Sequence, residues 1–285
     1  MWLESIKKAI EKLEAINPKN DYAYERAILA LVGIKDLPIL TIDIKPGEIS
    51  SLYRTRTHET PNLFQKVSDV SIPPNSSVKY FARCNRPHQS VFYCAEDRQT
   101  SYAELVEYWV EEKTKEPKLF VSVGKWKLKK TMKAVIVTTP DASNRISKFD
   151  KQHGPALDEF IYRQTDERKE ALIMFYRYLW DKFRKPAKSD PKTYLITTAY
   201  SNIVLMQTSL GLNAIYYPSV PLNGQGINFA INSEFVNYEN LEPLAFFRTE
   251  FTIEEIENKK YNFKDAGMIY TDKINVSQNR IIWPN

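Results

Sequence analysis

Short alternating segments and longer helical segments follow one another irregularly along this chain, and this irregularity constrains the fold most. Residues 40–44 alternate as Leu-Thr-Ile-Asp-Ile before Lys-Pro-Gly, which predicts a strand and a turn. Further short strands are expected at 51–57, 91–95, 119–123, 133–138, 194–198, 214–217, 228–231 and 244–251. Because no regular βα alternation links these segments, the predicted class is α+β, a mixed β core flanked by helices. Residues 119–123 and 133–138 are expected to pair as a hairpin.

Helical periodicity is clearest at the N-terminus. Residues 2–15 place apolar side chains at helical spacing, and a second helix is expected over 21–33, where Gly33 fits the C-terminal cap. Both helices would belong to an N-terminal helical extension over residues 1–45. It is either a layer that covers the main domain or a surface that binds a partner.

The rest of the chain divides into a main domain at 46–251 and a C-terminal extension at 252–285. Within the main domain, helices are expected over 101–110, 156–183 and 199–210, and the second of these is rich in aromatic residues. Residues 184–192 are interpreted as a loop.

Composition excludes several classes of protein. With 43% hydrophobic and 26% charged residues, the 285-residue chain can bury a sizeable core. The net charge of +5 is dispersed apart from one basic cluster at 125–133, so a nucleic-acid partner is not indicated. Two cysteines are too few for a disulfide framework, and with three histidines they indicate no metal site. No signal peptide or membrane-spanning run is evident, so a cytoplasmic protein with no membrane partner is expected.

Arginines, a tyrosine and a glutamate are spread over separate predicted elements between residues 53 and 104. The segments that carry them are Tyr53-Arg54-Thr55-Arg56, Arg83-Cys84-Asn85, Val91-Phe92-Tyr93 and Ala103-Glu104-Leu105. Arginine binds a pyrophosphate through charge-assisted, two-pronged hydrogen bonds, and an aromatic ring can stack on a flat ligand ring. A carboxylate stabilises a sugar that becomes positively charged. The pattern is typical of a nucleotide-cleaving site.

Together with Tyr217-Pro218-Ser219 and Gly226-Ile227-Asn228, these segments resemble the RES family, which is named for an arginine, a glutamate and a serine. The resemblance covers roughly residues 46–251. It implies an ADP-ribosyltransferase-like fold and an enzyme that consumes NAD as a substrate, with no permanently bound cofactor. Where relatives tend to have Arg-x-Asn-Pro-Pro-Gly, this chain has Arg-Cys-Asn-Arg-Pro-His at 83–88, which changes the expected pocket rim.

The resemblance assigns a role to each motif residue. Glu104 would stabilise the oxocarbenium-like transition state in which nicotinamide leaves the ribose, and a neutral leaving group needs no strong acid. Arg54 and Arg83 would bind the pyrophosphate, and Arg56 shares the face of Arg54 by strand alternation. Alanine in place of either motif arginine is expected to weaken NAD binding.

The remaining motif residues would hold the rest of the nucleotide. Tyr93 would stack on nicotinamide, and the amides of Asn85 and Asn228 would add hydrogen bonds to NAD. Ser219 is expected to position the ribose or an arginine, because no histidine lies nearby in sequence to make it a nucleophile. The glycines at 224 and 226 are not a dinucleotide fingerprint, since Phe229 replaces the third glycine.

Three functions remain open at this stage. The chain could cleave NAD with water or phosphate as acceptor, as a toxin or defence effector, or transfer ADP-ribose to a protein. It could also be a catalytically silent module that binds a nucleotide or nucleic acid. Glu104 favours the two enzymes, because a carboxylate beside phosphates does not help an anion-binding cleft. The resemblance also implies an antitoxin partner, and a homo-oligomer is left open.

Overall fold

A mixed β-sheet with helices gathered at one end makes up the protein. The computed structural model describes residues 2–58, 61–112, 118–185, 190–206, 210–257 and 260–284. The sheet strands are β1 (Thr41–Ile44), β2 (Leu52–His58), β3 (Val91–Ala95), β4 (Lys118–Leu128), β5 (Met132–Ile136), β6 (Ala214–Pro218), β7 (Ile227–Asn232), β8 (Leu241–Glu257) and β9 (Lys260–Thr271). Over the described residues, these nine strands run in the order β1-β5-β6-β7-β3-β2-β4-β8-β9. A short hairpin, β10 (Ile274–Asn275) and β11 (Arg280–Ile281), follows.

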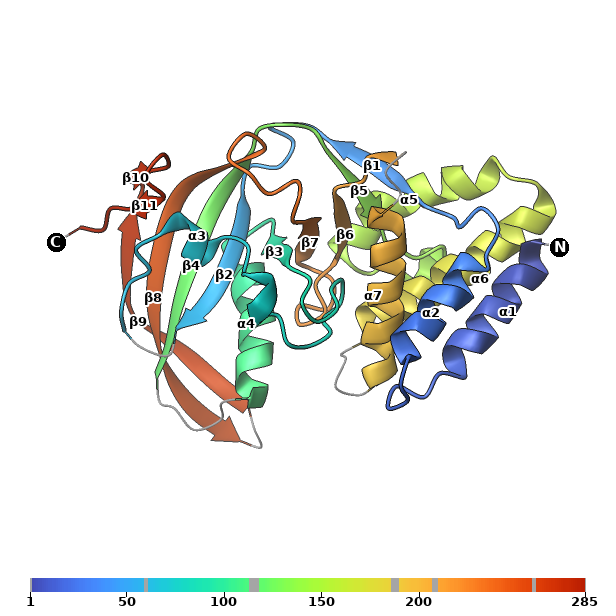
Figure 1. Cartoon of the computed structure of the whole chain (residues 1–285), viewed down its shortest axis with the longest axis horizontal. Coiled ribbons are helices and arrows are strands. Elements are labelled where there is room, and N and C mark those ends of the chain that lie inside the picture. Colours follow the sequence, from blue (N-terminus) through green and yellow to red (C-terminus); the bar gives the residue numbers. More distant parts are fainter. Residues whose placement is uncertain are drawn as a thin grey trace.

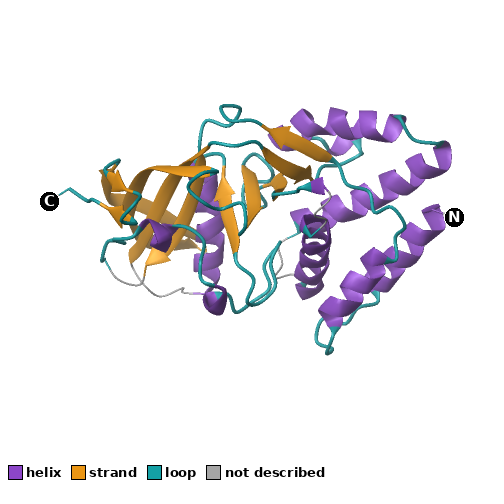
Figure 2. Ribbon diagram, turned by 45° about the horizontal axis from the view of Figure 1, so that its top comes forward, coloured by secondary structure: helices purple, strands orange, loops and turns teal. Residues whose placement is uncertain are grey.

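The helices cover the sheet unevenly. They are α1 (Trp2–Glu14), α2 (Ala23–Val32), α3 (Val67–Val70), α4 (Arg98–Glu112), α5 (Lys148–Tyr162), α6 (Asp166–Arg184) and α7 (Pro191–Leu205). Figure 1 shows α1, α2, α5, α6 and α7 together at the N-terminal end, whereas α4 lies beside the long strands at the other end. Figure 2 shows the same separation of a helical part from a strand-rich part. The predicted α+β class is confirmed. Within the described ranges, no helix has the length and apolar character needed to cross a bilayer.

The predicted hairpin between 119–123 and 133–138 is wrong. β4 pairs with β2 and with β8, and its register with β8 runs from Lys118 to Leu128. β5 pairs antiparallel with β1 and parallel with β6, on the far side of the sheet from β4. Each of the two strands has a strand neighbour on both of its edges, which leaves no edge for a hairpin between them.

Two helix predictions also need correction. The single helix expected over 156–183 is two helices, because the chain leaves the helical conformation at Thr165, which caps α6 with extended backbone angles. Residues 194–198, expected as a strand, lie inside α7. That helix begins at Pro191, and the Asp190 side chain accepts the Lys192 N–H. The β-branched run Ile-Thr-Thr at 196–198 favours a strand locally, but all three side chains are buried against neighbouring elements, and this packing decides the conformation.

The N-terminal helices are part of the core. Ile6, Ala9 and Leu13 of α1 are buried in the same apolar cluster as the central strands. The Glu14 carboxylate lies 2.8 Å from the Nζ of Lys182, whose side chain on α6 is almost wholly buried. β8 and β9 likewise continue the sheet beyond residue 251. Both terminal segments therefore pack on the central part of the fold. The domain boundaries expected near residues 45 and 251 stay predictions.

Leu13→Ala is expected to lower the free energy of unfolding by about 2–5 kcal/mol, the usual cost of truncating a buried leucine. The Leu13 side chain is fully buried, so the change leaves a cavity between α1 and the core. Urea denaturation of the variant and of Glu11→Ala, an exposed position on the same helix, measures the effect. Equal denaturation midpoints for the two variants would mean that α1 adds little to stability.

Candidate functional site

Three side chains of the motif set meet on one face of the sheet. The Oε1 atom of Glu104 accepts hydrogen bonds from Ser219 Oγ at 2.7 Å and from Asn228 Nδ2 at 2.6 Å. Glu104 lies on α4, Ser219 directly follows β6, and Asn228 lies on β7. Ser219 and Asn228 are buried, whereas Glu104 is half-buried. We call these three residues the Glu104 cluster.

The start of α4 is held close to β7. Asp97 accepts the Thr100 N–H at 2.7 Å and the Thr100 hydroxyl at 2.6 Å, which satisfies a helix donor that would otherwise lack a partner. Thr100 packs against the backbone of Gly226, where a Cβ would lie 2.3 Å from the Thr100 hydroxyl oxygen. Only glycine permits this approach. The contact brings Glu104, one helical turn further along, to Asn228.

A tight loop places Ser219 beside Asn228. In this Ser219 loop, residues 219–226, the Ser219 N–H donates to the Gly226 carbonyl and the Gly224 N–H donates to the Ser219 carbonyl, at 2.8 and 2.7 Å. Asn223 and Gly224 adopt left-handed backbone angles, with φ of 50° and 80°. The loop therefore turns the chain from β6 directly into β7, and the Ser219 hydroxyl faces Glu104.

Tyr93 lies on the same face of the sheet as Asn228. Ala95 pairs with Asn228, so these two side chains point to the same face of the sheet. Tyr93, two residues before Ala95 on β3, points to that face as well. The Tyr93 hydroxyl accepts the Cys84 N–H and donates to Asn85 Oδ1, both at 2.9 Å. Burial raises the pKa of this hydroxyl well above its usual value. Because both contacts hold the hydroxyl in place, the half-buried ring is the part of Tyr93 suited to a ligand.

Arg83 caps a helix in this structure. Its Nη1 donates to the carbonyls of Lys182 and Phe183 at 3.3 and 2.7 Å, and its Nη2 donates to the Lys185 carbonyl at 3.2 Å. These carbonyls lie at the end of α6 and have no partner within the helix. A cation at this end is also favourable, because the helix dipole gives it partial negative charge. Arg83 thus fixes the end of α6.

Arg54 leaves β2 on the opposite face from the Glu104 cluster. Tyr53 pairs with Ala95, and the Thr55 hydroxyl contacts Ser101 on α4, so these odd-numbered residues of β2 face the cluster. Arg54 Nε donates to the Ser71 carbonyl and its Nη1 to the Tyr93 carbonyl, both at 2.8 Å.

The Arg54 side chain is buried beside an aromatic ring. Its guanidinium lies 5.1 Å from the centre of the Phe92 ring, and burial lowers its pKa to about 10. Arg56 shares this face by alternation and is half-buried. Among the described residues, neither Arg54 nor Arg83 makes a hydrogen bond to the Glu104 cluster.

Several residues near the cluster were not predicted from the sequence. Tyr217 is buried and lies two residues before Ser219 on the same face. Burial raises the pKa of its hydroxyl, and nearby groups that include Glu104 raise it to a lesser degree. Thr100 and Gly226 form the contact that places α4. The two glycines of the Ser219 loop were the available signal, because closely spaced glycines mark places where the backbone comes near another group.

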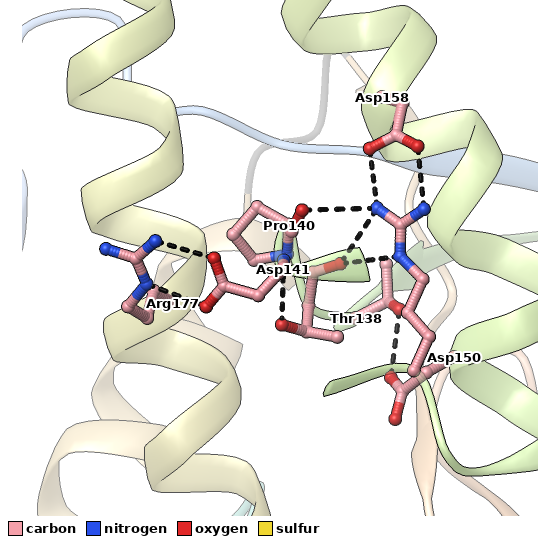
Figure 3. A network of polar contacts seen from close by, with 8 residues as sticks. Thr138, Pro140, Asp141, Asp150, Asp158 and Arg177 are labelled. Carbon is pink, nitrogen blue, oxygen red and sulfur yellow. Dashed lines mark hydrogen bonds and ion pairs between the residues drawn. The ribbon is translucent and has the colours of Figure 1, made fainter. Parts of the chain in front are cut away.

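A separate cleft lies between α1 and α6. It has a volume of about 560 Å³, and Lys7, Asp141, Arg177 and Trp180 are among its lining residues. Arg177 forms a two-pronged ion pair with Asp141 at 2.6 and 2.8 Å, and Figure 3 shows the two side chains facing each other. The lining of this cleft includes no residue of the Glu104 cluster or of the motif set, so it is not part of the candidate site.

Comparison with protein families gives a match. The family model described as the RES domain matches residues 51–244, which is more than half of the chain and includes every motif residue discussed above. No curated protein matches the sequence.

Proposed function

The chain belongs to the RES-domain family, and from this membership we propose that it is an enzyme that cleaves the bond between nicotinamide and ribose in NAD. Water or phosphate would accept the ADP-ribose, as in a toxin or a defence effector. The observation that carries this proposal is the Glu104 cluster.

The geometry of Glu104 suits the transition state of this reaction. Both hydrogen bonds, from Ser219 and Asn228, reach Oε1 and fix the plane of the carboxylate. Oε2 can then accept a hydrogen bond from a ribose hydroxyl while the sugar gains positive charge. A carboxylate that is already oriented needs no rearrangement when that charge develops. The Ser219 hydroxyl donates a hydrogen bond to Glu104, which fits a positioning role.

The two motif arginines would act mainly through the fold. Arg54 holds the backbone of Tyr93, and Arg83 holds the end of α6, with backbone carbonyls as acceptors in both cases. We propose that they keep the Tyr93 ring and the cluster in place for NAD. A guanidinium has five N–H donors. A direct contact with the pyrophosphate would therefore use donors that are not bonded to the backbone carbonyls.

Product analysis tests the proposal. The purified protein is incubated with NAD alone, with inorganic phosphate and with a mixture of candidate protein acceptors, and the products are identified by mass spectrometry. Nicotinamide with ADP-ribose is expected without phosphate, or nicotinamide with phosphorylated ADP-ribose when phosphate is the acceptor. ADP-ribose found only on protein would make the chain a transferase. NAD binding without nicotinamide release in any arm would leave a silent nucleotide-binding module and refute the proposal.

A further inference from the structure

The Ser219 loop is also held from outside the candidate site, by the end of α6. Arg184 is the last residue of that helix. Its Nη2 donates to the Asn223 carbonyl in the loop at 3.4 Å, and its Nη1 donates to Asp150 Oδ2 at 3.0 Å. One guanidinium thus joins the loop to a carboxylate on α5.

Asp150 is a rigid anchor for this contact. Its side chain is fully buried. Oδ1 accepts from the Thr138 hydroxyl at 2.9 Å and from the Trp180 indole at 3.2 Å, and Oδ2 accepts from the Ser147 hydroxyl at 2.6 Å and from Arg184. A buried carboxylate with all of these donors has little freedom to move. Any group bonded to it is fixed relative to α5 and β5.

Because Gly224 has no side chain, the loop can pack closely against Ser147 and Arg184, which both bond to Asp150. A Cβ at position 224 would lie 2.6 Å from the Cβ of Ser147 and 3.3 Å from Arg184 Nη1, closer than ordinary side-chain contacts. The φ of 80° is itself a conformation that glycine favours. The loop backbone at Gly224 therefore packs directly against Ser147 and Arg184.

We propose that Arg184 and Gly224 are positioning residues that hold the Ser219 loop so that Ser219 and Asn228 orient the Glu104 carboxylate. The inference rests on the proposed function. Neither residue donates to the Glu104 carboxylate, whose hydrogen bonds come from Ser219 and Asn228. Their effect passes through the loop backbone, in which the Gly224 N–H donates to the carbonyl of Ser219 and the Ser219 N–H to that of Gly226.

The first test changes the loop side of the contact. Gly224→Ala is expected to lower kcat for NAD cleavage by about 10- to 100-fold, because small displacements of a catalytic group have effects of this size. KM should stay within about twofold, since the carboxylate acts chiefly in the transition state. Gly47→Ala is the matched control: Gly47 also has a positive φ, of 93°, but no heavy atom lies within 4 Å of its added Cβ. Equal kcat values for the two variants would overturn the inference.

The second test changes the helix side. Arg184→Ala should lower kcat as Gly224→Ala does, and Arg184→Lys should restore part of it, because lysine can pair with Asp150 but lacks a second arm for Asn223. Arg177→Ala removes an ion pair from the same helix without touching the loop and should behave like the parent. A kcat for Arg184→Ala equal to that of Arg177→Ala would contradict the inference.

Hydrogen exchange separates this inference from the proposed function. In full-length Arg184→Ala, the amides of Ser219 and Gly224 should exchange faster than in Arg177→Ala, while amides in α1 should be unchanged. Unchanged exchange in the loop would show that Arg184 does not hold it, whether or not the protein cleaves NAD. Faster exchange with an unchanged kcat in an active protein would show that the loop does not position the cluster. A parent protein that releases no nicotinamide refutes the proposed function instead.

Discussion

Replacing Glu104 with glutamine is expected to lower kcat for NAD cleavage by about 10²- to 10³-fold while the protein stays folded. Glutamine has the same shape, and its carbonyl oxygen can accept the hydrogen bonds that Ser219 and Asn228 donate to Oε1. The substitution therefore removes the negative charge with little change in structure. NAD affinity should change little, because the charge matters most when the sugar becomes cationic. Steady-state kinetics of nicotinamide release, with circular dichroism to check the fold, measures the effect.

Glu96→Gln is the control for this prediction. Glu96 is a second half-buried carboxylate near β7, and it accepts a hydrogen bond from the Tyr216 hydroxyl at 2.6 Å. The Tyr216 ring stacks on Phe229, on the opposite face of the sheet from Asn228. The control variant should keep the parent's kcat. A folded Glu104→Gln protein that also kept it would remove Glu104 from the reaction.

Arg54→Ala is expected to lower the free energy of unfolding by about 3 kcal/mol. The change leaves the carbonyls of Ser71 and Tyr93 without their charged donor in a buried place. Lysine should restore only part of the stability, since it cannot reach both carbonyls in the fork geometry of arginine. Urea denaturation followed by tryptophan fluorescence gives the midpoints.

Arg56→Ala is the matched comparison, two residues further along the same face of β2. It is half-buried, and its loss should cost less than about 1 kcal/mol. NAD affinity of the folded variants completes the experiment. An Arg54→Ala protein that unfolds at the parent's midpoint yet fails to bind NAD would show that Arg54 contacts the nucleotide directly.

The sequence indicates Glu104, Ser219 and Asn228 as site residues, but it did not predict that they contact one another, since Ser219 was expected to position the ribose or an arginine. The structure brings Glu104, Ser219 and Asn228 into hydrogen-bond contact. Strand alternation also predicts correctly that Arg54 and Arg56 share a face. It does not say which face. That depends on the pairing of Tyr53 with Ala95, a contact between distant segments that no local pattern contains.

Other features that the sequence did not predict also depend on long-range contacts. The hydrogen bonds of Arg83 were not predicted, because their acceptors, the last carbonyls of α6, are about a hundred residues away in sequence. The role of Arg83 as a pyrophosphate ligand stays a prediction. The strand expected at 194–198 is helical because packing outweighs the preference of β-branched residues. The break before α6 was the exception, since Thr165 followed by two acidic residues is a local helix-start signal that the aromatic periodicity obscured.

The separation of the cluster in sequence has a consequence for protein synthesis. Ser219 and Asn228 follow Glu104 by 115 and 124 residues. A chain on the ribosome therefore exposes the carboxylate long before the residues that orient it have been made, and contacts over such distances form late in folding. If the protein consumes NAD as proposed, an unfinished or truncated chain cannot do so. The producing cell's coenzyme supply is then exposed only to chains that extend beyond Asn228.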